Sequence, residues 1–196
     1  VFRDYGLTVE FKWGGTNTRW GDRVGRARDS GIFLHATGPD GNSHDGDGAF
    51  MAAIECNVFE GATGDFLLIR GDDAQGRLIA PGVTITSDGR RDADGWPWWT
   101  PGGQPLTLER WGRVNWRDKD PDWQDVTGFR GVNGVERPHG QWNELLVRCR
   151  RDAIEIRLNG ELVNRATNVW PREGKILVQC EGSELFIRKL ELSLIP

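Results

Sequence analysis

Five polar side chains within or beside apolar, strand-like segments are the residues of this sequence most suited to chemistry. Carboxylates and imidazoles can transfer protons near neutral pH, and carboxamides can bind hydroxyl groups. Together these side chains would suit acid–base chemistry on a substrate rich in hydroxyl groups. They are His35, Glu55, Asn57, Gln179 and Glu181.

The position of these residues follows from the alternation of side chains along a strand, which sends neighbours to opposite faces of a sheet. Glu55 and Asn57 alternate with apolar neighbours, so we expect both to face away from the core. The segment 177–181 predicts that Val178 and Cys180 face inward, whereas Gln179 and Glu181 face outward.

The same alternation places His35 on the face of Phe33. If the strands are neighbours in one curved sheet, all five polar side chains could converge on its concave side. The alternative is that each is simply a solvated residue on the outer face of an antiparallel sheet.

Residues 87–138 are rich in Gly, Pro, Asp and Arg and contain six tryptophans. Flat aromatic rings can bind the C–H faces of a sugar ring. We therefore predict Trp98, Trp116 and Trp123 as substrate-binding residues. A small hydrophobic cluster beneath a long loop is an equally good explanation of these tryptophans.

Strand-like segments separated by Gly- and Asp-rich turns recur along the chain, and no long segment has helical periodicity. The clearest turn is Asn159-Gly160, a pair typical of two-residue hairpins. These patterns predict an all-β, two-sheet antiparallel sandwich formed by residues 1–196 as a single domain, with 87–138 as an elaborate loop. The predicted strands are 5–13, 31–36, 50–59, 65–70, 77–86, 142–150, 153–158, 175–180 and 185–194.

Composition excludes several classes of protein. The chain has 25 Lys and Arg against 29 Asp and Glu, and no basic stripe, so nucleic acid is not an expected partner. No apolar stretch is long enough to predict a transmembrane segment. The three cysteines have no metal-site spacing and are expected to be buried free thiols. Val1 already lies in a strand-like pattern, which suggests that a further segment precedes it.

Motifs for other chemistries are missing from the sequence. It contains no nucleophile elbow, phosphate-binding loop or zinc-protease motif. The segment 38–48 is rich in Asp and Gly and has oxygen ligands suited to calcium, but its spacing does not match an EF-hand. A solvated turn is the preferred interpretation, and His139 is expected to be a loop residue.

Several short motifs occur along the chain at 29–34, 54–61, 140–144, 158–160, 178–182 and 186–190. In this order and spacing they together resemble the 3-keto-disaccharide hydrolase domain family over nearly the whole chain. The family's Gly-Glu-Trp-Asn signature is matched at 140–143, with Gln141 in place of the acidic residue. The resemblance implies a jelly-roll sandwich of the concanavalin-like or laminin-G-like type and a secreted or periplasmic location.

The resemblance also implies a reaction. A ketone at carbon 3 of a sugar acidifies the proton on carbon 2, so a base can remove it and expel the glycosidic oxygen from carbon 1 before water adds. On this hypothesis Glu55 or His35 is the base, and Glu181 is the partner acid or a metal ligand. Asn57, Gln179 and the loop tryptophans would hold the sugar. A divalent metal ion or hydrogen-bond donors would stabilise the enolate.

Two alternatives remain open from the sequence. A non-catalytic carbohydrate-binding module would use the same sandwich and the same aromatic and amide side chains. Such a module predicts an open groove with coplanar tryptophans, whereas an enzyme predicts a titratable group with a perturbed pKa in a pocket. A scaffold domain of a larger assembly would instead present a flat apolar patch.

Overall fold

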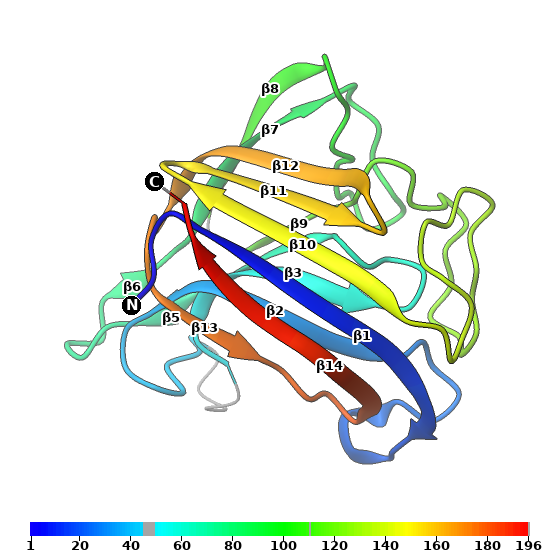
Figure 1. Cartoon of the computed structure of the whole chain (residues 1–196). Helices are drawn as coiled ribbons and strands as arrows, with labels where there is room; N and C mark the ends of the chain where they lie inside the picture. Colours follow the sequence, from blue (N-terminus) through cyan, green and yellow to red (C-terminus); the bar gives the residue numbers. More distant parts are fainter. Residues whose placement is uncertain (45–49, 110, 196) are drawn as a thin grey trace.

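In the computed structural model, two antiparallel sheets pack face to face, which confirms the predicted all-β sandwich. The structure describes residues 1–44, 50–109 and 111–195. Figure 1 looks onto the larger sheet, with the smaller sheet behind it. In spatial order, the seven-stranded sheet consists of β14 (Ser183–Leu194), β1 (Tyr5–Asn17), β10 (Asn143–Arg150), β11 (Ala153–Leu158), β12 (Glu161–Trp170), β7 (Gly82–Ser87) and β8 (Gln104–Glu109).

The smaller sheet has five strands, and a separate two-stranded ribbon consists of β5 (Gly71–Asp72) and β6 (Leu78–Ile79). Within the described residues the only helix is the short 3-10 turn η1 (Trp20–Asp22). No helix among these residues is long and apolar enough to cross a membrane. The five-stranded sheet consists of β13 (Lys175–Val178), β2 (Asp29–Thr37), β3 (Ala52–Phe59), β4 (Phe66–Ile69) and β9 (Gly112–Val114).

The core lies between the sheets and takes alternate apolar side chains from each of them. On β3, Ile54, Cys56 and Val58 are almost fully buried in this core. The hairpin between β11 and β12 turns at Asn159 and Gly160, both of which have positive φ angles, as a two-residue turn of this type requires. The sequence therefore predicted both the alternation and this turn correctly.

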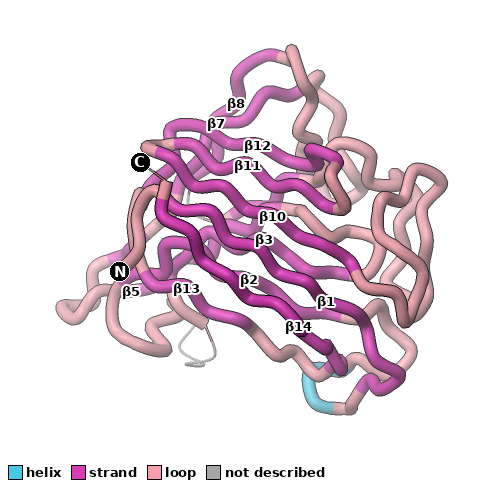
Figure 2. Tube along the Cα trace, in the orientation of Figure 1, coloured by secondary structure: helices cyan, strands magenta, loops and turns pink. Residues whose placement is uncertain are grey.

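The segment 87–138 differs from its prediction as a loop, because it contains β8 and β9. β8 is an edge strand, which explains how Pro105 is accommodated in a sheet despite lacking an N–H group. The predicted strand 77–86 is interrupted, and Pro81 lies between β6 and β7. Figure 2 shows that the remaining loops of 115–142 gather at the end of the sandwich far from the two termini.

The last predicted strand before the C-terminal one also needs correction. β13 ends at Val178, which is 42% exposed, and Cys180 is exposed, so neither side chain enters the core. β13 is an edge strand of only four residues, and the regular alternation stops where its pairing stops. Of the three cysteines, only Cys56 and Cys149 are buried free thiols.

Candidate functional site

The outer face of the five-stranded sheet carries the candidate site, and its floor is Gly31 on β2. Gly31 pairs with Asn57 on β3, and its carbonyl oxygen accepts a hydrogen bond of 2.9 Å from the Gln179 backbone N–H. Glu55 is the next outward residue of β3 and pairs with Phe33 on β2 and Leu67 on β4. The pairing of β2 with β3, and of Gly31 with the residue that follows β13, thus brings Glu55, Asn57 and Gln179 together around Gly31.

The missing side chain of Gly31 leaves the space that two polar groups occupy. A Cβ atom at this position would lie 2.1 Å from Glu55 Oε1 and 2.9 Å from Gln179 Oε1. A glycine inside a strand often marks such a close approach. The glycine therefore allows the carboxyl and the amide oxygen to face the same small volume.

Three carboxyl groups influence one another at this site. Burial, followed by the nearby Glu181, raises the pKa of Asp29 to about 7. Burial raises the pKa of Glu55 well above its usual range, and Asp29 and Glu181 raise it further. Burial also raises the pKa of Glu181, although Arg23 and a hydrogen bond with Gln179 act in the opposite direction. In all three groups burial therefore favours the protonated form, and each is also influenced by the charges of its neighbours.

Two arginines supply positive charge beside these carboxyls. Arg23 Nη1 lies 3.3 Å from Asp29 Oδ2, and its charge lowers the pKa of both Asp29 and Glu181. Arg113 projects from β9 and lowers the pKa of Asp29 and Glu55. The site is thus a set of mutually repelling carboxyls between two guanidinium groups.

A buried ion pair helps to position Arg113. Asp65, which is fully buried, lies 3.0 Å from Lys119 Nζ and accepts a hydrogen bond of 2.8 Å from the Trp116 backbone N–H. Its Oδ2 atom is also 3.9 Å from Arg113 Nε. Asp65 thereby connects the start of β4 to β9 and to the loop that follows it.

Two buried oxygen atoms at the site, Asn57 Oδ1 and Gln179 Oε1, have no hydrogen-bond partner among the residues that the structure describes. Leaving a buried acceptor unpaired costs about 1–3 kcal/mol. Unpaired acceptors beside an acid–base cluster suit a ligand that brings hydroxyl groups, because each hydroxyl can donate one hydrogen bond.

Aromatic rings lie at one end of the site. The Phe59 ring, on the same face of β3 as Glu55, has Arg23 and Arg113 over it at 6.0 and 5.7 Å. Trp123 packs against Phe59 with ring centroids 4.8 Å apart, and its Nε1 donates to the Glu60 carbonyl oxygen. Of the three tryptophans predicted to bind substrate, Trp123 is the one adjacent to this cluster.

The structure corrects the placement of the other two tryptophans. Trp98 and Trp116 are each 3% exposed, so neither presents a ring face on which a sugar could lie. Trp98 Nε1 donates to the Lys119 carbonyl oxygen, and Trp116 belongs to the main core. Trp116 is therefore part of the main core, whereas Trp123 is the tryptophan that packs against a smaller, separate cluster.

His35 also lies away from the cluster. It has a φ angle of 54°, within an irregularity in the pairing of β2 with β3, and this reverses the side to which its ring points. The ring packs edge-on against the core residue Tyr5 at 5.8 Å, and Nδ1 lies 2.8 Å from the Pro171 carbonyl oxygen. Burial lowers the pKa of His35. The expectation that His35 shares the face of Phe33 was therefore wrong.

The donor set does not match a metal site. Among the described residues, no three His, Cys, Asp or Glu side chains come close enough to hold a metal ion, so we derive no step through one. Part of the calcium-like segment 38–48, residues 45–48, lies outside the described residues.

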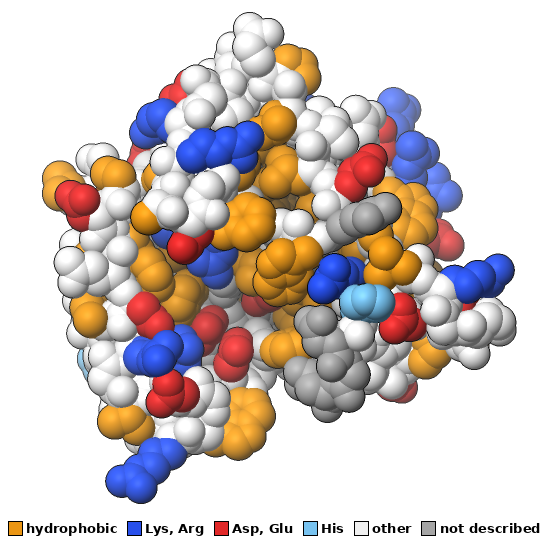
Figure 3. Space-filling model, turned by 180° about the vertical axis from the view of Figure 1, so that it is seen from behind, with side chains coloured by type: hydrophobic (Ala, Val, Ile, Leu, Met, Phe, Trp, Pro, Cys, Tyr) orange, Lys and Arg blue, Asp and Glu red, His pale blue; other side chains and the backbone are white. Residues whose placement is uncertain are grey.

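Asp29, Arg23 and Arg113 were not among the site residues predicted from the sequence. Asp29 precedes Gly31 by two residues, so strand alternation could have placed it on the outer face. Arg113 lies in the segment predicted as a loop, and Arg23 lies outside any predicted strand. Figure 3 shows this side of the molecule, where acidic side chains gather beside a hollow bordered by hydrophobic ones.

Nearly the whole chain matches a known protein family. The sequence profile described as the 3-keto-alpha-glucoside-1,2-lyase-like domain matches residues 1–193 and confirms the resemblance drawn from the sequence motifs. A search of the curated proteins found no significant match.

Solved structures with similar architecture include two crystal structures of candidate glycosyl hydrolases from Parabacteroides distasonis. They are 13% and 14% identical, with TM-scores of 0.43, and the alignments cover 99% and 100% of this chain and 79% and 73% of theirs. Sheep galectin-11 in complex with glycerol is 8% identical with a TM-score of 0.42, covering 98% of this chain and 92% of that one.

Proposed function

The chain belongs to the 3-keto-alpha-glucoside-1,2-lyase-like domain family, and on this premise we propose that it cleaves the glycosidic bond of 3-keto-glycosides. The observation that carries the proposal is the set of three interacting carboxyls, Asp29, Glu55 and Glu181, between Arg23 and Arg113. Groups whose environments separate their pKa values are suited to act as acid and base in one reaction.

The first step is an elimination. A base removes the proton from carbon 2, the electron pair forms the C1–C2 double bond, and the C1–O bond breaks. The departing oxygen takes a proton from an acid and leaves as an alcohol. The 3-keto group makes this feasible because the negative charge that develops on carbon 2 is shared with the ketone oxygen.

We assign the acid to Glu55 and the base to Glu181. Glu55 is 4% exposed and has its pKa raised by burial and by two neighbouring carboxyls, which favours its protonated form. Glu181 is less buried and has Arg23 nearby, which favours its ionised form. This reverses the role expected for Glu55 from the sequence, where it was assigned as a base.

The remaining side chains would bind and stabilise. A guanidinium group such as Arg113 can stabilise an enolate oxygen electrostatically. Asn57 Oδ1 and Gln179 Oε1 would accept hydrogen bonds from sugar hydroxyls, which would satisfy both unpaired atoms. Trp123 and Phe59 offer apolar ring surface beside the same cluster.

Water addition would complete hydrolysis with the two roles exchanged. Glu55, now ionised, removes a proton from water as the oxygen bonds to carbon 1, and Glu181 returns its proton to carbon 2. The enzyme regains its starting protonation state, and the products are a free 3-keto sugar and an alcohol. A lyase would release the unsaturated sugar before this step.

The test is release of alcohol from a panel of 3-keto-glycosides, measured beside their unoxidised parents. We expect turnover of the keto forms alone, because only they have an acidified proton on carbon 2. Glu55→Gln and Glu181→Gln should each lower kcat by about 10²–10⁴-fold, the usual contribution of a positioned acid or base. Glu191→Gln, an exposed change on β14, is the matched control.

Equal turnover of the parent glycosides would overturn the proposed mechanism. Sugar binding without any turnover would favour the non-catalytic binding module instead. The raised pKa of Asp29 and the burial of Trp98 and Trp116 support the enzyme over that module, which needs an open groove with exposed rings.

A further inference from the structure

The outer face of the seven-stranded sheet, on the opposite side of the sandwich, carries three adjoining hollows of about 330, 510 and 520 Å³. Arg165 lines both the first and the second hollow. Thr84 and Asn168 line both the second and the third. The shared residues place the three hollows next to one another in a row across the sheet, and we call this row the back groove.

Strand pairing explains why the groove runs across the sheet. Arg150 on β10 pairs with Ala153 on β11, Thr167 on β12 pairs with Thr84 on β7, and Thr84 pairs with Thr107 on β8. Adjacent strands are about 4.8 Å apart, so five strands span roughly 19 Å. This length suits a short oligomer better than a single small ion.

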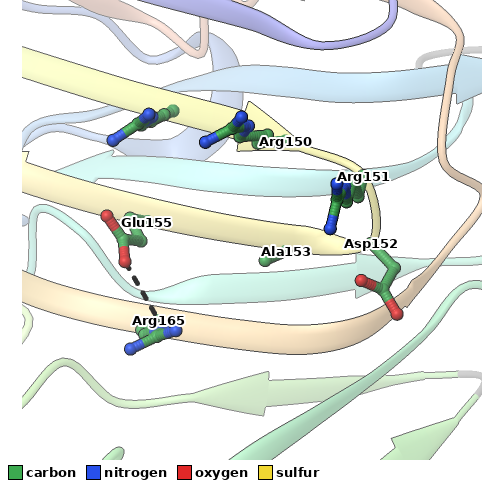
Figure 4. Close-up of a pocket in the computed structure, with 7 residues that line it drawn as sticks. Arg150, Arg151, Asp152, Ala153, Glu155 and Arg165 are labelled. Carbon is green, nitrogen blue, oxygen red and sulfur yellow. Dashed lines mark ion pairs between the residues drawn. The ribbon is translucent and has the colours of Figure 1, made fainter.

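The first hollow is lined mainly by arginines around a small side chain. Figure 4 shows the short Ala153 side chain between Arg165 and the arginines of the β10–β11 turn. Four arginines line this hollow, against the two carboxylates of Asp152 and Glu155. The arginines are Arg148, Arg150, Arg151 and Arg165.

The two acids leave much of this positive charge available. Glu155 lies 3.5 Å from Arg165, and Asp152 lies 3.9 Å from Arg172, which does not line the hollow. Among the residues that the structure describes, Arg148 and Arg151 have no carboxylate within ion-pair distance, and both are exposed. A local excess of arginine in a chain of net charge −4 suits an anionic group, because guanidinium binds oxyanions through paired hydrogen bonds.

The other two hollows are uncharged over most of their lining and suit a sugar. Thr84 Oγ1 lies 2.9 Å from Thr107 Oγ1 and accepts a hydrogen bond from Asn168 Nδ2. Trp170 lines the far end and is 51% exposed, so its ring surface is available. Hydroxyls, an amide and an exposed indole are the groups that recognise the hydroxyl and C–H surfaces of sugar rings.

We propose that the back groove binds a short segment of an acidic glycan, with a carboxylate or sulfate group held by Arg148 and Arg151 and neutral sugar units lying toward Trp170. The choice of a glycan rests on the proposed carbohydrate function, whereas the anionic preference rests on the arginines alone. Because the groove and the candidate site lie on opposite sheets, a polymer held at the groove would leave the candidate site free.

The experiment measures binding of uronate-containing and sulfated oligosaccharides by isothermal titration calorimetry, beside neutral oligosaccharides of the same length and inorganic sulfate. The test protein carries Arg148→Gln and Arg151→Gln together. We expect the affinity for the acidic oligosaccharides to fall by about tenfold or more, which corresponds to about 1.4 kcal/mol of binding free energy. Trp170→Ala should weaken binding of oligosaccharides but not of inorganic sulfate. Whichever acidic series binds more tightly identifies the anionic group as carboxylate or sulfate.

Arg157→Gln is the matched control, because Arg157 lies on β11 of the same sheet and lines none of the three hollows. Its affinity should equal that of the unaltered protein. Equal affinity for neutral oligosaccharides, binding of inorganic sulfate alone, or undiminished affinity in the double variant would each overturn the proposal. Glu55→Gln should leave this binding unchanged, so failure of the candidate site and failure of the groove give different results.

Discussion

The carboxyl group of Glu55 lies over Gly31 on the neighbouring strand, in the space that a Cβ atom on residue 31 would fill. The relationship explains why a glycine occurs in the middle of a sheet, where it otherwise weakens the strand. The position of the Glu55 carboxyl therefore depends on the absence of a side chain at residue 31.

Gly31→Ala should therefore reduce activity with little effect on stability. The added methyl group would push against the ends of the Glu55 and Gln179 side chains and not against backbone, so the side chains can move aside. A misplacement of about 1 Å can lower kcat about 100-fold. Steady-state kinetics would measure the loss of activity, and thermal unfolding would measure the stability. A variant that keeps full kcat would contradict the assigned role of Glu55.

Asp29→Asn should shift the pH profile of activity through Glu55. The Asp29 charge raises the pKa of Glu55, so its removal lowers that pKa. If Glu55 acts as the acid, activity falls as pH rises through its pKa, and the alkaline limb of kcat/KM moves to lower pH. A shift of the acidic limb instead would show that Glu55 acts as the base.

The same variant should change the dependence of stability on pH. The folded pKa of Asp29, about 7, is above its usual 3.8, so the folded state binds more protons between these values. This contribution to stability is fully present below pH 3.8 and is lost as pH rises through 7. In Asp29→Asn the group no longer titrates, so the variant does not lose this stability as pH rises. The difference in Tm between variant and unaltered protein should therefore grow in favour of the variant from pH 5 to pH 8, and a constant difference would contradict the raised pKa.

Asp65→Asn should be strongly destabilising. Asp65 and Lys119 are both buried, and removing one charge of a buried pair costs about 3–5 kcal/mol because the other is left unpaired. Urea unfolding would measure the loss. Asp73→Asn, which breaks the exposed pair with Arg77, is the comparison, and an equal loss in both variants would contradict the importance of burial.

Two tryptophans of the segment 87–138 should respond differently to substitution. Trp98→Ala should cost about 3–5 kcal/mol of stability, as truncation of a buried aromatic residue usually does. Trp123→Ala, beside Phe59, should raise KM for the keto substrate and lower stability less. Unfolding curves and steady-state kinetics of both variants separate the roles, and an unchanged KM for Trp123→Ala would remove Trp123 from the site.

The fold class, the β11–β12 turn and the outward direction of Glu55 and Asn57 could all be predicted from the sequence. Each depends on local rules, since side chains alternate along any regular strand and Asn-Gly pairs favour positive φ angles. The family was also recognisable from the order of short motifs along the chain.

Which of these residues lie close together depends on contacts between strands that are distant in the sequence. A local irregularity at His35 turned its ring into the core, and the end of pairing at β13 exposed Val178, because both depend on the partner strand and not on the strand's own residues. Tertiary packing also buried Trp98 and placed Trp116 in the main core. The strand order β13-β2-β3-β4-β9 brought Glu181, which follows the edge strand β13, and Arg113, on the opposite edge strand β9, to the carboxyls of the central strands. No spacing in the sequence specifies that order.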